Sequence, residues 1–173
     1  MKLQLALVFL GVAATAAMAG PKDIVLTAAK DVKWTPLDPK LGDKGPQFSV
    51  VFGDMKKKAP IGFLLKVPPG GKAGPHTHTS DDYAVIIQGT EHNFKAPGTD
   101  EGTGITSGGT WFQPGGQPHD NECEASSKDG CVTFVYMANG FDFKPWVDPA
   151  AKKDAPKKDD KPATPPKKDE KKG

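Results

Sequence analysis

Three histidines and one aspartate have the residue types and spacing of a metal site. His76 and His78 are two residues apart, so on an extended strand both imidazoles project from the same face and can converge on one ion. Asp82 keeps the same parity, and His119 follows the turn at 114–118. Imidazole supplies affinity for a divalent transition metal, and a carboxylate offsets the charge of the ion. We therefore expect His76, His78, Asp82 and His119 to form a metal site.

The expected donor set leaves room for chemistry at the ion. Four protein ligands on an octahedral ion leave two positions for water, a substrate or dioxygen. The cofactor we expect is a divalent ion, either Fe, Mn or Zn, and the expected partner is a small-molecule ligand or substrate. All 23 basic side chains are Lys, which modestly disfavours an anionic cosubstrate that is usually held by the planar fork of Arg.

The elements that must position these residues are short strands. Sustained helical periodicity is absent outside the first residues, whereas partly alternating apolar runs recur between clusters of Gly, Pro, Asp or Lys. We predict an all-β sandwich or jelly-roll barrel, with the glycine-rich span 97–109 as a surface loop. The predicted strands are 23–27, 32–35, 47–52, 62–67, 82–88, 91–95, 110–113, 118–123 and 131–137.

The two ends of the chain differ from this body. Residues 1–19 have Lys2, an apolar run and a small-residue cleavage site, which predicts a signal peptide and a periplasmic or secreted protein. The apolar run is shorter than a membrane-spanning helix needs, and no later segment is long enough either. Residues 151–173 contain almost only Lys, Asp, Glu, Pro and Ala, which predicts a disordered tail.

Charge is unevenly divided between these parts. The formal net charge of +2 combines nine Lys and five acidic residues in 151–173 with a body, residues 20–150, that is net acidic. The body therefore offers no basic surface for nucleic acid, and we expect none as a partner. Self-association as a homodimer is left open by the sequence.

Two glycine-bounded motifs resemble those of a known superfamily. The run Gly70-x5-His76-x-His78-x3-Asp82-x6-Gly89 resembles the first cupin motif, and Gly108-x5-Pro114-x-Gly116-x2-His119-x3-Cys123 resembles the second. The body as a whole is similar to small single-domain cupins of the ChrR-like branch. The resemblance implies a cupin-type double-stranded β-helix, a jelly-roll barrel, over 20–150. It also implies a metal inside, bound at the positions of His76, His78, Asp82 and His119.

The sequence departs from the cupin pattern at two ligand-motif positions. Asp82 replaces the usual Glu, so its shorter carboxylate either reaches the ion directly, reaches it through water, or does not ligate. Cys123 replaces the usual Asn. Cys123 and Cys131 have turn residues between them, which favours a disulfide across a hairpin in an exported chain, whereas the competing interpretation is a free Cys123 thiol near the metal.

Two function classes fit these residues. The first is a metal-dependent enzyme of the dioxygenase, decarboxylase or isomerase type. The second is a non-catalytic binding or sensing module, because one fold hosts many chemistries. Outside the four expected ligands no clear acid–base pair stands out: His92 and Glu91 fit exposed strand positions, and Tyr83 and Tyr136 fit a packed core.

Overall fold

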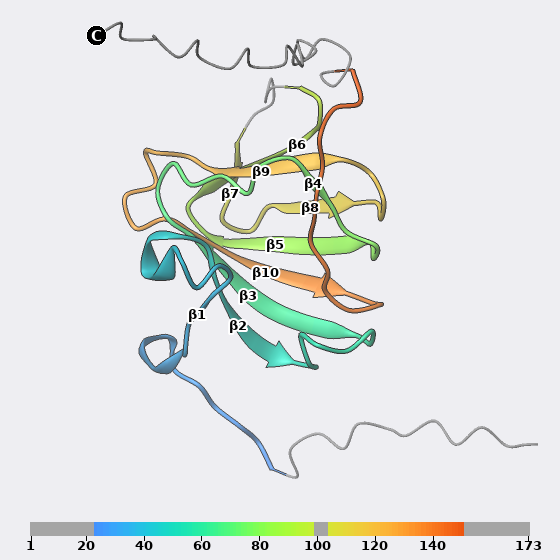
Figure 1. Cartoon of the computed structure of the whole chain (residues 1–173). Coiled ribbons are helices and arrows are strands. Elements are labelled where there is room, and N and C mark those ends of the chain that lie inside the picture. Colours follow the sequence, from blue (N-terminus) through green and yellow to red (C-terminus); the bar gives the residue numbers. More distant parts are fainter. Residues whose placement is uncertain (1–22, 99–103, 151–173) are drawn as a thin grey trace, which may run out of the picture. The chain divides into compact units, whose positions relative to one another are not determined.

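The computed structural model describes residues 23–98 and 104–150, and it forms two antiparallel sheets of strands (Figure 1). The predicted signal peptide and tail therefore lie outside the described residues. By its contacts the chain divides after Val32, and the part from residue 33 onward contains both sheets. The strands are β1 (Thr35–Pro36), β2 (Gln47–Phe52), β3 (Ile61–Val67), β4 (His76–Thr77), β5 (Asp82–Gln88), β6 (Thr90–Lys95), β7 (Ile105–Thr106), β8 (Thr110–Gln113), β9 (His119–Cys123), β10 (Cys131–Met137) and β11 (Lys144–Pro145).

The six-stranded sheet has the order β1-β2-β3-β10-β5-β8 and supplies most of the apolar core. Two of its long strands alternate between buried and less buried positions: on β10 every second residue from Cys131 to Met137 is buried, and on β5 Asp82, Ala84 and Ile86 are buried. The core cluster consists of Ile61, Phe63, Ala84, Val135 and Met137, and Trp111 packs against it. This face forms one wall of the interior.

The five-stranded sheet, in the order β11-β4-β9-β6-β7, forms the facing wall and is more polar. His76 on β4 and His119 on β9 are direct cross-strand partners. On β6 the inward position Glu91 pairs with Cys123. Figure 1 shows β4, β6 and β9 in one layer and β2, β3, β10 and β5 in the other. His76 and His119 therefore lie on the polar wall.

The predicted strands are largely confirmed, with corrections near the N-terminus. Residues 24–28 are extended but pair with no strand of the described residues, so the strand predicted at 23–27 is wrong. Of the strand predicted at 32–35, only Thr35–Pro36 forms, after the 3-10 turn Ala29–Asp31. A second such turn is Gly42–Lys44. The predicted loop 97–109 contains β7, with residues 99–103 outside the description.

A disulfide joins the two sheets at one end. Cys123 on β9 and Cys131 on β10 are bonded, with Cα atoms 5.7 Å apart, and both are fully buried beside Val67. This confirms the predicted bond and excludes the free thiol. The predicted hairpin geometry is wrong, because β9 and β10 belong to different sheets. The bond therefore links the polar wall to the apolar wall.

Among residues 23–98 and 104–150, no helix has the length and apolar character needed to cross a membrane.

Candidate metal centre

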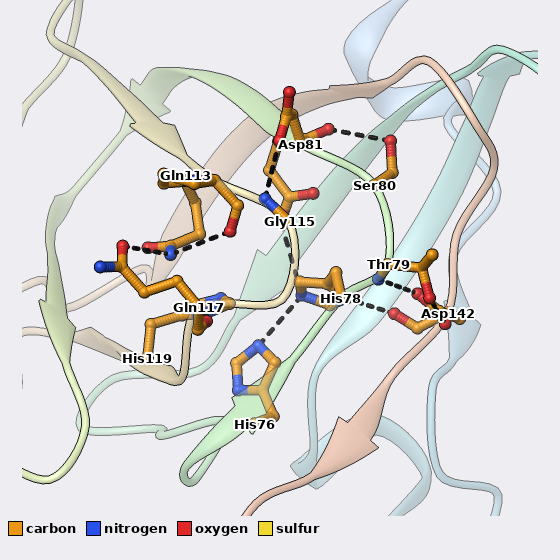
Figure 2. Close-up of polar contacts among 12 residues, drawn as sticks. His76, His78, Thr79, Ser80, Asp81, Gln113, Gly115, Gln117, His119 and Asp142 are labelled. Carbon is orange, nitrogen blue, oxygen red and sulfur yellow. Dashed lines mark hydrogen bonds and ion pairs between the residues drawn. The ribbon is translucent and has the colours of Figure 1, made fainter.

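Three histidines from separate positions in the sequence meet inside the barrel. His76 is on β4, His78 follows that strand by one residue, and His119 opens β9. All three are buried, and each has a ligand atom within 4.8 Å of the ligand atoms of the other two. Figure 2 shows the contact between the rings of His76 and His78, and His119 comes from the strand that pairs with β4. The structure thus brings together the three imidazoles that the spacing predicts.

Backbone carbonyls fix the tautomer of each ring. Nδ1 of His76 donates to the Gly74 carbonyl at 2.7 Å, and Nδ1 of His119 donates to the Gln117 carbonyl at 2.9 Å. Nδ1 of His78 donates to the Asp142 carbonyl. A neutral ring that donates from Nδ1 presents a lone pair on Nε2. All three rings therefore present Nε2 to the same small volume, as the ligands of a metal do.

The distance between the Nε2 atoms of His76 and His78 matches coordination of one ion. With metal–nitrogen bonds of about 2.1 Å, neighbouring ligands are about 3.0 Å apart in an octahedral site and about 3.4 Å apart in a tetrahedral one. The Nε2 atoms of His76 and His78 are 3.1 Å apart. Nε2 of His119 is buried without a hydrogen-bond partner. The donor set therefore fits a divalent transition metal.

Asp82 lies at the edge of this cluster. Its Oδ2 atom is 3.5 Å from Nε2 of His78, slightly beyond an ideal ligand-to-ligand spacing, and its Oδ1 atom has no partner. The side chain is 2% exposed, and it lines a cavity that His76 and His78 also line. Asp81 points elsewhere, since its Oδ1 atom accepts from the Gly115 amide at 2.7 Å. Asp82 is therefore the carboxylate near the three rings, as strand parity predicts.

Burial controls the ionisation of the cluster. Desolvation lowers the pKa of His76 to about 4, helped by the neighbouring imidazoles, and it also lowers the pKa values of His78 and His119. Desolvation raises the pKa of Asp82 to about 8, with the negative charges of Asp142 and Asp81 adding to the effect. Neutral imidazoles at physiological pH are the form that binds a metal. A divalent cation would also favour the ionised form of Asp82.

The two motif loops and a C-terminal segment hold the rings in place. The Gly116 amide donates to the His78 carbonyl at 2.7 Å, which ties the turn before His119 to the loop that carries His78. The Asp142 carboxylate accepts hydrogen bonds from the Thr79 amide and the Thr79 hydroxyl, both at 2.6 Å (Figure 2). The backbone carbonyl of Asp142 accepts the hydrogen bond from Nδ1 of His78. Phe143 stacks on His76 with ring centroids 4.4 Å apart. Segment 141–145 therefore supports the site, a role that the sequence did not indicate.

A cavity of about 400 Å³ opens beside His76, His78 and Asp82. One wall comes from the six-stranded sheet, and Leu37, Leu41, Phe141 and Phe143 contribute around it. Two buried donors that line it, Asn121 Nδ2 and Trp111 Nε1, have no acceptor. The wall residues from the sheet are Phe63, Leu65, Val67, Trp111, Val135 and Met137.

The remaining polar candidates all lie outside the three-histidine cluster. His92 is on the outward side of β6, facing Glu122 across the strands, so it lies outside the three-histidine cluster. The exposed position expected for it is wrong, because its side chain is only 13% exposed. Glu91 was predicted to be solvated, and this is wrong: it is 1% exposed, and its Oε2 accepts from the Thr133 hydroxyl. Tyr83 and Tyr136 were expected in the core, but they lie on the outer face of the six-stranded sheet, where Tyr83 is half exposed.

Comparison with known proteins places the chain in a family. A family model described as a domain of unknown function, DUF4437, matches residues 24–167. The chain belongs to this family. No curated protein sequence matches it.

Solved structures share the arrangement of the two sheets. An RmlC-like cupin from Ralstonia eutropha has a TM-score of 0.53 at 17% identity, over 68% of this chain and 69% of that one. KdgF from Halomonas sp. has a TM-score of 0.50 at 17% identity, over 65% and 93%. A structure described among DMSP lyases has 0.55 at 18%, over 69% and 65%. At such identities the likeness shows the fold, which is the cupin-like double-stranded β-helix.

Proposed function

We propose that residues 20–150 form an exported metal-dependent cupin. It would act on a small, mostly apolar molecule that carries carbonyl or carboxylate oxygens. The observation that carries the proposal is the convergence of three neutral Nε2 atoms beside a cavity with apolar walls. The reaction types that fit are dioxygenation, decarboxylation and isomerisation. Placement near the ChrR-like branch is part of the proposal.

The cavity supports this ligand class. Its walls are built mainly from side chains that cannot hydrogen-bond, which disfavours a sugar with hydroxyls on every face. Asn121 Nδ2 and Trp111 Nε1 are donors without acceptors, and buried donors are costly unless a ligand or water satisfies them. A ligand with carbonyl or carboxylate oxygens on an apolar body satisfies both donors and buries its remaining surface.

The residues around the cavity would have different roles in the reaction. His76, His78 and His119 would hold the ion, which when bound polarises a ligand oxygen. Asp82 would act in one of two ways: as a fourth ligand, or as the group that takes up a proton from the bound molecule. Its unpartnered Oδ1 and its place on the cavity wall support both roles. The apolar walls would exclude water from the reacting centre.

A non-catalytic binding or sensing role is the second candidate. Apart from the histidines and Asp82, the titratable side chains around the cavity are Asp38 and Lys72. If Asp82 is used as a ligand, the described residues offer few groups for proton transfer in the interior. This scarcity favours a module in which the ion orients a bound molecule without turnover.

The disulfide supports export through an oxidising compartment. Disulfides persist in secreted and periplasmic proteins and are reduced in the cytosol. The Cys123–Cys131 bond therefore agrees with the signal peptide proposed for residues 1–19. A periplasmic or extracellular location remains part of the proposal.

Elemental analysis of the protein purified from its own compartment tests the proposal. Iron or manganese, together with oxygen uptake or product formation from small carbonyl and enediol compounds, would support an enzyme. Tightly held zinc with ligand binding but no turnover would support the binding module. A protein that binds no divalent ion after reconstitution would contradict both.

The ligand class has its own test. Trp111→Phe keeps the ring but removes the indole donor, so it should weaken binding of oxygen-bearing ligands and leave metal content unchanged. Trp34→Phe, a change in a tryptophan that does not line the cavity, is the matched control. Equal ligand affinity in the three proteins would contradict the donor role.

A further inference from the structure

The two sheets are joined beside both ends of β10. At its first residue, Cys131, the disulfide leads to β9. After its last residue, Met137, the chain crosses to the five-stranded sheet, where β11 pairs with β4 (Figure 1). We call residues 141–145, which make this crossing, the strap. The disulfide is a covalent link, whereas the strap lies on the barrel through noncovalent contacts and is therefore the link that can detach.

Neighbouring residues of the strap have different surroundings. Phe141 and Phe143 line the cavity, and their ring centroids lie 5.7 and 6.1 Å from that of His78. Asp142, between them, directs its carboxylate to Thr79 instead (Figure 2). Alternation of this kind is usual in an extended segment. One segment therefore forms part of the cavity wall and also covers a ring of the metal cluster.

Three polar groups at the surface attach the strap to the loop after His78. Oδ1 of Asp142 accepts from the Thr79 amide, and Oδ2 accepts from the Thr79 hydroxyl, both at 2.6 Å. The Lys144 ammonium donates to the Thr79 hydroxyl at 2.6 Å and lies 3.0 Å from Oδ2 of Asp142. We call Thr79, Asp142 and Lys144 the latch.

The carboxylate of the latch is charged at neutral pH. Partial burial alone would raise the pKa of Asp142, but the hydrogen bonds from Thr79 and then Lys144 lower this pKa to about 2. Hydrogen bonds to an ionised acceptor are stronger than those between neutral groups. The latch therefore holds the strap with charge-assisted bonds.

The rest of the strap is attached more weakly. Its strand, β11, has two residues, both exposed, and lies at the edge of the five-stranded sheet. Directly after it, the Trp146 amide donates to the Pro75 carbonyl at 2.8 Å. Short edge pairings with exposed hydrogen bonds open locally at a low free energy. The latch therefore contributes much of what keeps the strap closed.

A closed strap encloses the three rings. His76, His78 and His119 are 2%, 7% and 1% exposed. The proton on Nδ1 of His78 is bonded to the Asp142 carbonyl, so detaching the strap breaks this anchor. The ring of His78 is then free to rotate or to change tautomer, and either change withdraws Nε2 from the cluster.

We propose that Asp142 and Thr79 are positioning residues for the metal site: their contact keeps the strap closed, and the ion exchanges with solvent when the strap opens. This inference rests on the metal binding of the proposed function. Exchange through a sparsely populated open state is proportional to the population of that state. A weaker latch should therefore speed release of the ion even while the closed state predominates.

Release of Zn²⁺ from the loaded full chain into excess chelating dye tests the proposal, at dye concentrations where the rate no longer depends on the dye. Asp142→Ala removes both hydrogen bonds to the carboxylate and should speed release about tenfold or more. Thr79→Val removes the hydroxyl at nearly constant side-chain shape and should speed release about 3- to 10-fold. Thr79→Ser keeps the hydroxyl, so it should release zinc at nearly the rate of the unmodified chain.

Hydrogen exchange of the Trp146 amide measures opening of the strap without any metal. In the metal-free protein this amide should exchange faster than the Ile86 amide, which donates to the Gly109 carbonyl at 2.9 Å. Asp142→Ala and Thr79→Val should each speed exchange at Trp146 by a factor similar to their effect on zinc release. Exchange at Ile86 should stay unchanged.

Glu122→Gln is the matched control. Glu122 pairs with Lys72 at 2.8 Å, and the two side chains are 28% and 57% exposed, close to the 35% and 60% of Asp142 and Lys144. The substitution should change neither zinc release nor exchange at Trp146. The melting temperature of each variant shows that it is folded.

Two results would overturn the role of the latch. Folded Asp142→Ala and Thr79→Val proteins could release zinc at the rate of the unmodified chain. Zinc release could instead rise while exchange at Trp146 stays the same, which would show that the strap is not the element that opens. If the unmodified chain binds no zinc, the proposed function fails, and exchange at Trp146 in the latch variants still decides whether Asp142 and Thr79 hold the strap.

Discussion

The Nε2 atoms of His76 and His78 lie 3.1 Å apart, although each ring already donates its Nδ1 proton to a backbone carbonyl. Two lone pairs that face each other repel, so this pair cannot be a hydrogen bond between neutral rings in those tautomers. A cation between the two nitrogens, shared with Nε2 of His119, removes the conflict. The anchoring of Nδ1 by the backbone therefore defines the site as much as the histidines themselves do.

The first prediction is that replacing one ring removes the metal. His78→Ala or His119→Ala leaves two imidazoles, so bound metal should fall well below one ion per chain after dialysis. His92→Ala is the control, because His92 is on the outward side of β6, and it should keep full content. Full metal content in both site variants, measured by elemental analysis, would show that the ion binds elsewhere.

The second prediction concerns the length and charge of residue 82. Asp82→Glu adds one methylene and should let the carboxylate reach further toward the Nε2 atoms, so affinity should be kept or strengthened. Asp82→Asn removes a charge that stabilises a divalent cation, so affinity should fall. Competition with a metal-binding dye measures both, and identical affinity in all three proteins would place the carboxylate outside the coordination sphere.

The strands and the cluster of three histidines could be predicted because their signals are local. Strand parity places His76, His78 and Asp82 on one face, and turn chemistry places His119 after 114–118. The same reasoning failed at 23–27, where a strand-forming sequence found no partner in the described residues. Pairing is a tertiary property, so propensity alone could not decide it.

The supports of the site could not be predicted, because they join residues distant in the sequence. The backbone carbonyl of Asp142 accepts a hydrogen bond from His78. Because every residue type has such a carbonyl, the sequence carries no signal for this contact. Glu91 was misjudged for a different reason. A charged residue in a strand is usually solvated, and only the pairing of β6 with β9 and the position of Thr133 on the facing sheet reveal that it is buried.

The third prediction concerns the C-terminal residues. Truncation after Pro149 removes the segment whose composition predicts a disordered tail and none of the residues of the core or metal cluster. Melting temperature and metal content should therefore be unchanged. A fall of several degrees, by calorimetry, would mean that the tail docks on the barrel.

The fourth prediction concerns the bond between Cys123 and Cys131. The bond closes a short loop, with a sequence separation of eight, so its loss should lower the free energy of unfolding by about 2–3 kcal/mol. Denaturant unfolding of Cys123→Ala with Cys131→Ala measures this loss. Metal content should survive, because β9 stays paired to β4 and β6. Loss of metal at full stability would instead assign the bond to the site.

The last prediction follows from Glu91. Burial raises its pKa to about 7 from an ordinary 4.5, while the Thr133 hydrogen bond and nearby His92 act in the opposite direction. Between these two pH values the folded protein binds more protons than the unfolded chain, so stability is lost as pH rises from about 4.5 to about 7. The shift corresponds to roughly 3 kcal/mol for this buried group.

Glu91→Gln keeps an oxygen that can accept from Thr133 but cannot ionise. Its free energy of unfolding should equal that of the unmodified protein near pH 4.5 and exceed it by roughly 2–3 kcal/mol near pH 8. The quantity to compare is the difference in free energy of unfolding between the two proteins. The contributions of the histidines and Asp82 cancel in it, because both proteins contain these residues. If the Glu91→Gln difference is the same at pH 4.5 and pH 8, burial does not raise the pKa of Glu91, and the interior around Thr133 must hold a compensating charge or water.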